Sequence, residues 1–327
     1  MLEWPMPWGL PEFTDQVQFT SHNIRLDDGT FTKPEAARSM VDYPYFKSAR
    51  GILETAFPGD KSQFRLADVG CLEGGYAVEF ARMGFQVVGI EVRDLNIAAC
   101  NYVKSKTDLP NLQFVQDNAM NIATHGPFDA VFCSGLLYHL DRPKQCLERI
   151  SSATKKLLIL STHFSLISPR ETKRGFPTKV RFAWSKLQFV VDLLVRRPDL
   201  GHLNRNLILS LPSENEGLPG RWYTEFPNDR SFRKRETAKW ASWDNRRSFW
   251  PQREHLLQAI RDVGFDLVME QYDNLEPSIA ESLLEGSYQK TLRGTFIGIK
   301  TGNPTIAAEA PLNVTSSAGA VNGLGAV

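Results

Sequence analysis

Short apolar runs alternate with segments of helical periodicity between residues 60 and 165. The runs lie at 66–69, 86–90, 130–133 and 156–161. Runs of this length without a regular alternation of polar and apolar positions are typical of strands that are buried on both faces, as in a parallel sheet. Parallel strands require crossover connections, and the helical segments between the runs supply them. The pattern therefore predicts an α/β fold built on a doubly wound, mostly parallel sheet.

The first apolar run leads directly into a glycine-rich turn with the sequence GCLEGG, at residues 70–75. A helical pattern begins near Gly75, and the next apolar run ends at Glu91. Glycines let the backbone approach a ligand closely, and the N–H groups at the start of a helix attract its polar atoms. An acid about twenty residues further on can accept the hydroxyls of a ribose. We therefore expect a nucleoside-containing cofactor at the carboxyl ends of the strands, in preference to a turn without a ligand.

The spacing of the glycines separates two classes of cofactor. The dinucleotide fingerprint is G-x-G-x-x-G, whereas this chain has D-x-G-x-x-x-G-G, with the Cys71 side chain close to where a pyrophosphate would lie. This departure disfavours an NAD-dependent reductase. The pattern resembles motif I of the class I S-adenosylmethionine-dependent methyltransferases, whose matching positions here are Asp68, Gly70, Gly74 and Gly75.

The resemblance extends to other segments in the order that the family shows. Residues 112–119, LQFVQDNA, look like the family's third strand and the acid that follows it. Residues 127–140, PFDAVFCSGLLYHL, look like its fourth strand and the loop after it. Strands expected at 266–269 and 291–300 look like the antiparallel sixth and seventh strands that close the methyltransferase sheet. The resemblance thus implies a seven-stranded Rossmann-like core and is strongest over residues 60–165.

The resemblance also implies how S-adenosylmethionine would be bound. The turn would surround the methionine and ribose through Asp68, Gly70, Cys71, Gly74 and Gly75. Glu91 would bind the ribose hydroxyls, and Val92 would lie under the adenine. Asp117 would accept a hydrogen bond from the adenine amino group, with Asn118 and Ala119 on either side of the contact. The backbone carbonyl of Ser134 would approach the methionine amine.

Histidines follow the fourth and fifth strands, whose carboxyl ends meet at the same edge of the sheet. His139 and His163 are therefore candidate catalytic bases, because histidine titrates near neutral pH and can take a proton from a hydroxyl or amine. The alternative for each is a loop histidine that hydrogen-bonds the backbone. Tyr43, Tyr45 and Lys47 are further candidates, because a helix before the first strand often closes over the methionine end of the cofactor in this family. Packing is the favoured interpretation for the two tyrosines.

The regular alternation stops at about residue 164. We expect five segments: an N-terminal extension with cap helices (1–58), the cofactor-binding core (59–165), an inserted lid or substrate region (166–250), a helix and strands that complete the sheet (251–302), and a disordered tail (303–327). Within the insertion, residues 181–196 suit an amphipathic helix that would serve as a lid, as core or as a homodimer surface. Further on, basic and aromatic residues are interleaved. Such a stretch suits an acidic or aromatic small molecule, a solvated surface or, less well, a nucleic acid.

The composition of the chain limits which classes of binding partner we expect. The formal net charge is +1, which gives no overall field that would attract nucleic acid or an anionic membrane. The four cysteines show no zinc-ligand spacing, so we predict no metal and expect reduced thiols. The start of the chain lacks the features of a secretory signal, and no apolar run is long enough to span a bilayer. We therefore expect a cytoplasmic protein without a membrane partner.

These observations predict an S-adenosylmethionine-dependent methyltransferase that methylates an oxygen or nitrogen of a small molecule by in-line transfer. One alternative is a methyltransferase that modifies tRNA or another RNA, which the basic and aromatic stretch supports and the near-zero net charge opposes. Another is a catalytically inactive subunit that binds the cofactor and regulates a partner.

Overall fold

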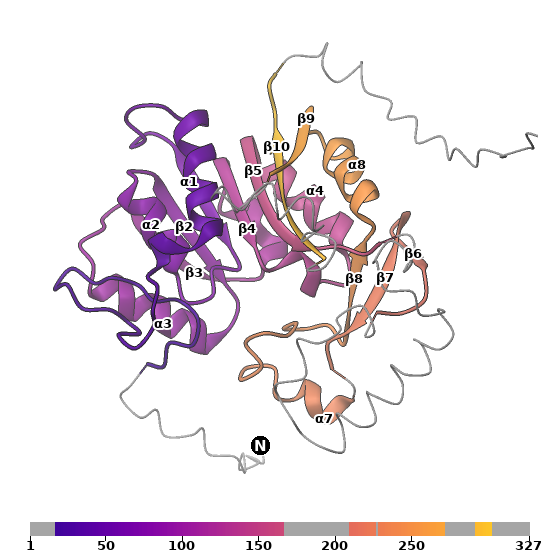
Figure 1. The fold of residues 1–327 in the computed structure, drawn as a ribbon, viewed down its shortest axis with the longest axis horizontal. Helices are drawn as coiled ribbons and strands as arrows, with labels where there is room; N and C mark the ends of the chain where they lie inside the picture. Colours follow the sequence, from indigo (N-terminus) through magenta and orange to yellow (C-terminus); the bar gives the residue numbers. More distant parts are fainter. Residues whose placement is uncertain (1–16, 167–208, 227, 272–291, 303–327) are drawn as a thin grey trace, which may run out of the picture.

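The computed structural model describes residues 17–166, 209–226, 228–271 and 292–302, and a seven-stranded sheet forms its centre (Figure 1). Its strands are β1 (Arg65–Val69), β2 (Gln86–Glu91), β3 (Leu112–Gln116), β4 (Phe128–Ser134), β5 (Thr154–His163), β9 (Leu267–Gln271) and β10 (Arg293–Ile299). They are arranged in the order β3-β2-β1-β4-β5-β10-β9. The first five strands are parallel, and β10 runs antiparallel to both of its neighbours. The prediction of a mostly parallel, seven-stranded α/β sheet is confirmed.

One detail of the closing strands differs from the expectation. Because β10 is antiparallel to β5 and to β9, strand β9 runs in the same direction as the first five strands. Only β10 is reversed within the sheet. A helix between β5 and β10 would not be needed for this pair, since antiparallel neighbours do not require a crossover helix.

Helices cover both faces of the sheet. On one face lie α1 (Pro44–Ala56), α2 (Gly75–Arg82) and α3 (Asp94–Ser105), and on the other lie α4 (Pro143–Ala153) and α8 (Arg253–Asp262). Successive strand residues point to opposite faces, and the packing follows this rule. Leu157 and Ile159 of β5 pack with the first group of helices, whereas Leu158 and Leu160 pack with the second group. Both faces of the strand are therefore buried, as the uninterrupted apolar run predicted.

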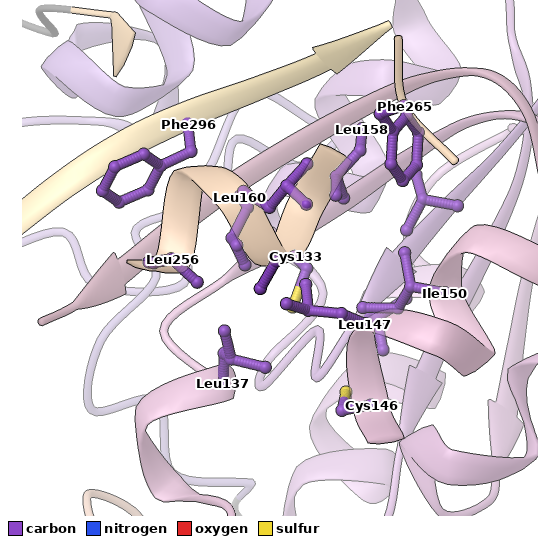
Figure 2. Close-up of a cluster of buried hydrophobic side chains, with 14 of the residues drawn as sticks. Cys133, Leu137, Cys146, Leu147, Ile150, Leu158, Leu160, Leu256, Phe265 and Phe296 are labelled. Carbon is purple, nitrogen blue, oxygen red and sulfur yellow. The ribbon is translucent and has the colours of Figure 1, made fainter. Parts of the chain in front are cut away.

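Figure 2 shows the second of these cores. Leu147 and Ile150 of α4, Leu256 of α8 and Phe265 gather around the side chains of β5. Helix α8 ends before Gly264, which has a φ of 105°, a left-handed conformation that glycine adopts without strain. This helix end allows Phe265 to enter the core with full burial.

Three short 3-10 helices complete the core: η1 (Met40–Asp42), η2 (Ala119–Thr124) and η3 (Leu137–His139). Pro44 occupies the first turn of α1, where its missing N–H is not needed for a helical hydrogen bond. The short η1 thus ends just before the proline, and α1 begins at it. No helix in the described ranges is both long and apolar enough to cross a membrane.

A second, antiparallel sheet stands beside the main one and was not predicted. It consists of β6 (Ser213–Asn215), β7 (Leu218–Thr224) and β8 (Arg247–Pro251), with the short α7 (Asp229–Phe232) in the connection between β7 and β8 (Figure 1). The expected boundary at residue 250 falls inside β8. Phe249 and Trp250 of β8 are buried in the core beneath α4 and α8, so this strand packs the second sheet against the core of the first. The helix expected at 181–196 and the tail expected at 303–327 lie outside the described residues.

The glycine turn between β1 and α2 is tightly bent. Gly70 and Gly74 have φ values of 72° and 81°, and Leu72 also has a positive φ of 55°. The backbone N–H groups of Gly70 and Cys71 both donate to the carbonyl of Ile90, at 2.8 and 3.1 Å, which fixes the turn against β2. A Cβ at Gly74 would lie 2.6 Å from the ring of Phe114, a residue of β3. Gly74 therefore permits β3 to pack directly beneath the turn.

We expect Gly74→Ala to lower the free energy of unfolding by about 2–4 kcal/mol, because a positive φ and an overlap with Phe114 are both imposed. Gly29→Ala is the matched control, since Gly29 has a φ of 85° and nothing lies within 4 Å of an added Cβ. The free energy of unfolding of the control should fall by only about 1–2 kcal/mol, because only the cost of a positive φ is imposed there. Urea unfolding of both variants measures the difference, and equal losses would contradict the role assigned to Phe114.

Candidate functional site

A cavity of about 270 Å³ opens at the carboxyl ends of β1 to β4, where the strand order reverses between β1 and β4. Ligands of open α/β sheets bind at such a reversal, because the loops diverge there and leave a crevice. The cavity is lined by most of the residues predicted from the sequence: Asp68, Gly70, Cys71, Glu91, Val92, Asp117, Asn118, Ala119, Ser134 and His139. Gly74, Gly75 and His163 are not among the lining residues.

Gly74 and Gly75 contact protein on the side where a ligand was expected. A Cβ at Gly75 would lie 2.8 Å from Nδ1 of His22 and from the sulfur of Met40. The backbone N–H of Gly75 donates to Nδ1 of His22 at 3.0 Å. Burial lowers the pKa of His22 to about 4, so this nitrogen stays available as an acceptor at neutral pH. The start of α2 is thus covered by the N-terminal segment, whose irregular sequence gave no signal of that position.

Asp68 is buried at the end of β1 and has an oxygen without a partner. Its Oδ2 makes no hydrogen bond in the structure, although the carboxyl group lines the cavity. Burial raises the pKa of Asp68 to about 8, a hydrogen bond from the backbone of Ala77 opposes this rise, and the charge of Glu91 adds to it. An unpaired carboxyl group in such a place is stabilised as an anion when a cationic group enters the cavity.

Glu91 ends β2 and is held rigidly by the backbone. Its Oε2 accepts from the N–H of Leu72 at 3.0 Å, and its Oε1 accepts from the N–H groups of Val92 and Arg93, each at 2.9 Å. A carboxylate offers about four acceptor sites. Three are used, so one site on Oε2 remains for a ligand hydroxyl, fewer than the sequence interpretation assumed for a ribose.

Asp117 follows β3 on the same side of the cavity. Its Oδ1 accepts from the backbone N–H of Asn118 and from Nδ2 of Asn121, both at 2.7 Å, and its Oδ2 lies 2.7 Å from Nε2 of His125. Partial burial acts to raise the pKa of Asp117, but the hydrogen bonds from Asn121 and His125 outweigh it and hold the pKa below its ordinary value. Asp117 is therefore an oriented anion at neutral pH, and it directly precedes Asn118, which caps η2.

His139 is paired with an acid that the sequence analysis did not select. Its Nδ1 lies 2.8 Å from Oε1 of Glu225, a side chain that is only 2% exposed. Ser248 donates its hydroxyl to the same oxygen at 2.8 Å, and the backbone N–H of Ser242 donates to the other oxygen at 3.1 Å. An ionised carboxylate only accepts hydrogen bonds, so Nδ1 of His139 carries the proton. Nε2 is then the nitrogen that can take up another proton.

Glu225 was missed because its pairing depends on the second sheet. It lies directly after β7, 86 positions beyond His139, in a region without a regular period. The sequence analysis treated this region as an inserted lid. An acid next to the interleaved aromatics was the available signal, but nothing in the sequence places it behind a particular histidine.

His163, the other predicted base, lies outside the cavity lining. Its ring stacks on Trp250 with centroids 4.7 Å apart and an interplanar angle of 8°. Its Nδ1 lies 2.9 Å from the backbone carbonyl of Leu292, and the side chain is buried. This position corresponds to the alternative named for it, a histidine that hydrogen-bonds the backbone.

A loop of the second sheet covers the cavity. This cover segment, residues 235–244, supplies Lys239, Trp240, Ala241, Ser242, Trp243 and Asp244 to the lining. Arg93, just after β2, donates to the carbonyls of Arg235, Ala238 and Ala241 at 3.2, 3.1 and 2.7 Å. Its guanidinium also lies 5.4 Å from the ring centre of Trp243. The cover segment is thus fixed to Arg93, which lies two positions after Glu91.

Glu73 connects the turn to the N-terminal segment and to the cover segment. Its carboxylate accepts from the backbone N–H groups of Thr20, Ser21 and His22 at 2.7, 3.0 and 2.8 Å, and Nζ of Lys239 lies 3.2 Å away. Burial acts to raise the pKa of Glu73, but the hydrogen bonds from these three residues bring it down to about 2. The group therefore remains charged throughout the neutral range.

Tyrosines and an arginine form the end of the cavity away from Glu91. Tyr43 and Tyr45, which the sequence analysis named as further candidates, line it together with Tyr76, Tyr138 and Arg293. The ring of Tyr138 lies 4.2 Å from that of His139 and connects this end to the His139–Glu225 pair. Arg293 was not singled out from the sequence, because it begins a strand far along the chain.

Comparison with known proteins agrees with this arrangement. Residues 67–158 match the family model described as "Methyltransferase domain". A protein of Geobacillus sp. (strain WCH70), whose name proposes a methyltransferase, is 32% identical over 111 residues, covering 32% of this chain and 44% of that protein. The ubiquinone biosynthesis O-methyltransferase of Albidiferax ferrireducens is 32% identical over 95 residues, covering 28% of this chain and 37% of that protein. The chain thus spans less than half the length of these curated relatives.

A solved structure shares the fold. The N-terminal domain of EvdMO1, crystallised with S-adenosylhomocysteine bound, superposes with a TM-score of 0.51 at 20% identity, covering 79% of this chain and 82% of that one. The sheet order, the motif residues around the cavity and the match over residues 67–158 lead to one conclusion. Residues 67–158 of the chain carry a methyltransferase domain, on the Rossmann-like sheet expected for the class I S-adenosylmethionine-dependent methyltransferases.

Proposed function

We propose that the protein transfers the methyl group of S-adenosylmethionine to an oxygen or nitrogen of a small-molecule acceptor. One observation carries the proposal. A single cavity is lined both by the motif residues that follow β1, β2 and β3 and by His139, which is backed by Glu225. The relative that methylates oxygen in ubiquinone biosynthesis supports an acceptor of this kind.

The residues present fit S-adenosylmethionine. The cofactor has a nucleoside with hydroxyl and amino donors, and an amino acid part with an ammonium group. Glu91 retains an acceptor site for a ribose hydroxyl, and Asp117 presents an oriented carboxylate at the next strand end. The unpartnered Oδ2 of Asp68 suits the ammonium group, because a buried carboxyl that lacks a partner gains most from a cation.

When bound, the cofactor supplies a methyl group on a sulfonium, which a nucleophile can displace in one step. The protein supplies placement, and correct orientation alone can account for about 7–11 kcal/mol of a barrier. The cover segment excludes water from the cavity and strengthens the electrostatic contacts within it. An acceptor hydroxyl or amine loses its proton to Nε2 of His139, and the Glu225 carboxylate stabilises the imidazolium that results.

The proposed function is tested with labelled S-adenosylmethionine and a cell metabolite extract, with and without ribonuclease. A labelled product that survives ribonuclease supports a small acceptor. Label that disappears with ribonuclease identifies an RNA methyltransferase instead. Absence of label in both, from a protein that binds S-adenosylhomocysteine in calorimetry, would favour the inactive regulatory subunit.

We expect His139→Gln to lower kcat by about 10²–10⁴-fold, the usual contribution of a positioned general base. The affinity for S-adenosylhomocysteine should remain unchanged, because the motif residues are not altered. His163→Gln is the matched control, since it removes a histidine outside the cavity lining, and its kcat should stay close to that of the original protein. Single-turnover rates with saturating cofactor measure both, and a comparable loss in the control would contradict this assignment.

Glu225→Gln should also lower kcat without changing cofactor affinity, but less than His139→Gln does. Glu225 acts through His139, so the double variant should be no slower than His139→Gln alone. Independent, multiplying losses in the same assay would show that Glu225 has a purely structural role.

Asp68→Asn should change how stability depends on pH. The folded protein holds a proton on Asp68 up to a pKa of about 8, whereas the unfolded chain loses it near its ordinary value of 3.8. The free energy of unfolding therefore falls as pH rises between these values. The variant should lack this fall, which thermal unfolding at pH 5 and pH 8 measures.

The same substitution should weaken binding of S-adenosylhomocysteine by about 10- to 150-fold, the value of a hydrogen bond to a charged group. Calorimetry at pH 7 in buffers of different ionisation enthalpy should detect proton release on binding to the original protein and none from Asp68→Asn. Equal proton release from the two proteins would rule out Asp68 as the ammonium partner.

A further inference from the structure

We propose that Arg293, held between Tyr45 and Tyr138, is a carboxylate-binding residue of this cavity. The carboxylate has two chemical sources, the methionine part of the cofactor and an acidic acceptor, and the experiment below distinguishes them. The inference rests on the proposed function, in that it assigns a ligand group to the same site.

The fold places Arg293 at the edge of the sheet where the cavity opens. Arg293 is the first residue of β10 and pairs in register with His163, the last residue of β5. Because β10 runs antiparallel to β5, the beginning of β10 lies beside the carboxyl end of β5. The half-buried side chain of Arg293 lines the cavity.

The guanidinium of Arg293 is fixed in position. Its Nε donates to the hydroxyl of Ser161 at 3.2 Å. Its central carbon lies 4.8 Å from the ring centre of Tyr45 and 5.9 Å from that of Tyr138. These contacts hold the plane of the guanidinium and leave its terminal nitrogens free, since they have no acceptor among the described residues. A fixed guanidinium fork matches the two oxygens of a carboxylate.

The other cationic side chains of the described lining already have partners. Arg93 donates to three backbone carbonyls of the cover segment, and Lys239 is paired with the buried carboxylate of Glu73. Arg293 forms no ion pair with any residue that the structure describes. A cation with uncommitted donors in a partly desolvated cavity is stabilised by an anion, because a charge removed from water needs a partner.

The carboxyl group of Asp68 lines the same cavity as Arg293. Burial raises the pKa of the Tyr76 phenol, the charge of Arg293 acts to lower this pKa and the charge of Asp68, when ionised, acts to raise it. The unpartnered Oδ2 of Asp68 and the free donors of Arg293 thus lie near the same ring. An ammonium and a carboxylate on one carbon, as in an α-amino acid, could occupy the two groups together. An acceptor acid beside His139 would occupy Arg293 alone.

The test compares two ligands that share an adenosine. S-adenosylhomocysteine carries the amino acid part, and 5′-methylthioadenosine lacks it. If the carboxylate belongs to the cofactor, Arg293→Gln should weaken S-adenosylhomocysteine by about 10- to 100-fold in calorimetry and leave methylthioadenosine unchanged. Arg293→Lys should recover part of this loss, because it retains the charge without the fork.

If the carboxylate belongs to the acceptor, both adenosine ligands should bind Arg293→Gln normally. The protein saturated with S-adenosylhomocysteine should then bind 4-hydroxybenzoate more tightly than 4-hydroxybenzamide, and Arg293→Gln should abolish this preference. Arg65→Gln is the matched control, because Arg65 also lies 4.8 Å from an aromatic ring centre, that of Phe128, at the opposite end of the sheet. It should leave all four affinities unchanged.

Two results would overturn the proposal. One is a set of affinities that Arg293→Gln does not alter for any of the four ligands. The other is an equal loss for methylthioadenosine and S-adenosylhomocysteine, which would assign Arg293 a structural role. These binding measurements do not require turnover, so a failure of methyl transfer would refute the proposed function and leave the assignment of Arg293 to be decided by affinity.

Discussion

A buried carboxylate within the glycine turn, that of Glu73, holds the site together. Three consecutive backbone N–H groups of the N-terminal segment and the ammonium of Lys239 converge on it. A buried charge is tolerated only when its partners are in place, so the turn, residues 20–22 and the cover segment must assemble as one unit. Two further features of the cavity depend on this assembly. The N-terminal segment closes the start of α2, and the cover segment brings Trp243 and Ser242 to the cavity wall.

The parts of the site that the sequence predicted are those fixed by local geometry. Asp68, Glu91 and Asp117 each stand at or just after the end of a strand, and parallel strands bring their carboxyl ends to one edge whatever the rest of the chain does. Burial on both faces made the strands themselves recognisable. The glycine pattern was recognised correctly, but Gly74 and Gly75 face Phe114 and His22 instead of the cavity. A sequence shows that a glycine lacks a side chain, but it does not show whether a ligand or a neighbouring residue occupies the space left by that side chain.

The remaining parts depend on contacts between distant segments. Glu225 reaches His139 across 86 positions and from a different sheet, and Arg293 reaches the cavity through an antiparallel strand at the end of the described chain. Arg93 followed a predicted acid, but its partners are carbonyls of a loop without periodicity. Every residue has a backbone carbonyl, so the residue types along the chain do not indicate which carbonyls Arg93 would contact. The second sheet was missed for a similar reason, since β6 is short and β7 contains proline and glycine.

The origin of the His139–Glu225 pair has a consequence for how such proteins diverge. The histidine lies within the residues that match the methyltransferase family model, whereas its acid comes from the second sheet, which is appended to the main one. Exchange or loss of that appendage during evolution would leave a chain that still recognises the nucleoside and yet lacks the group behind its histidine. Sequence similarity that is confined to the core would therefore not distinguish an active protein from an inactive one. The residue at the position of Glu225 would make this distinction.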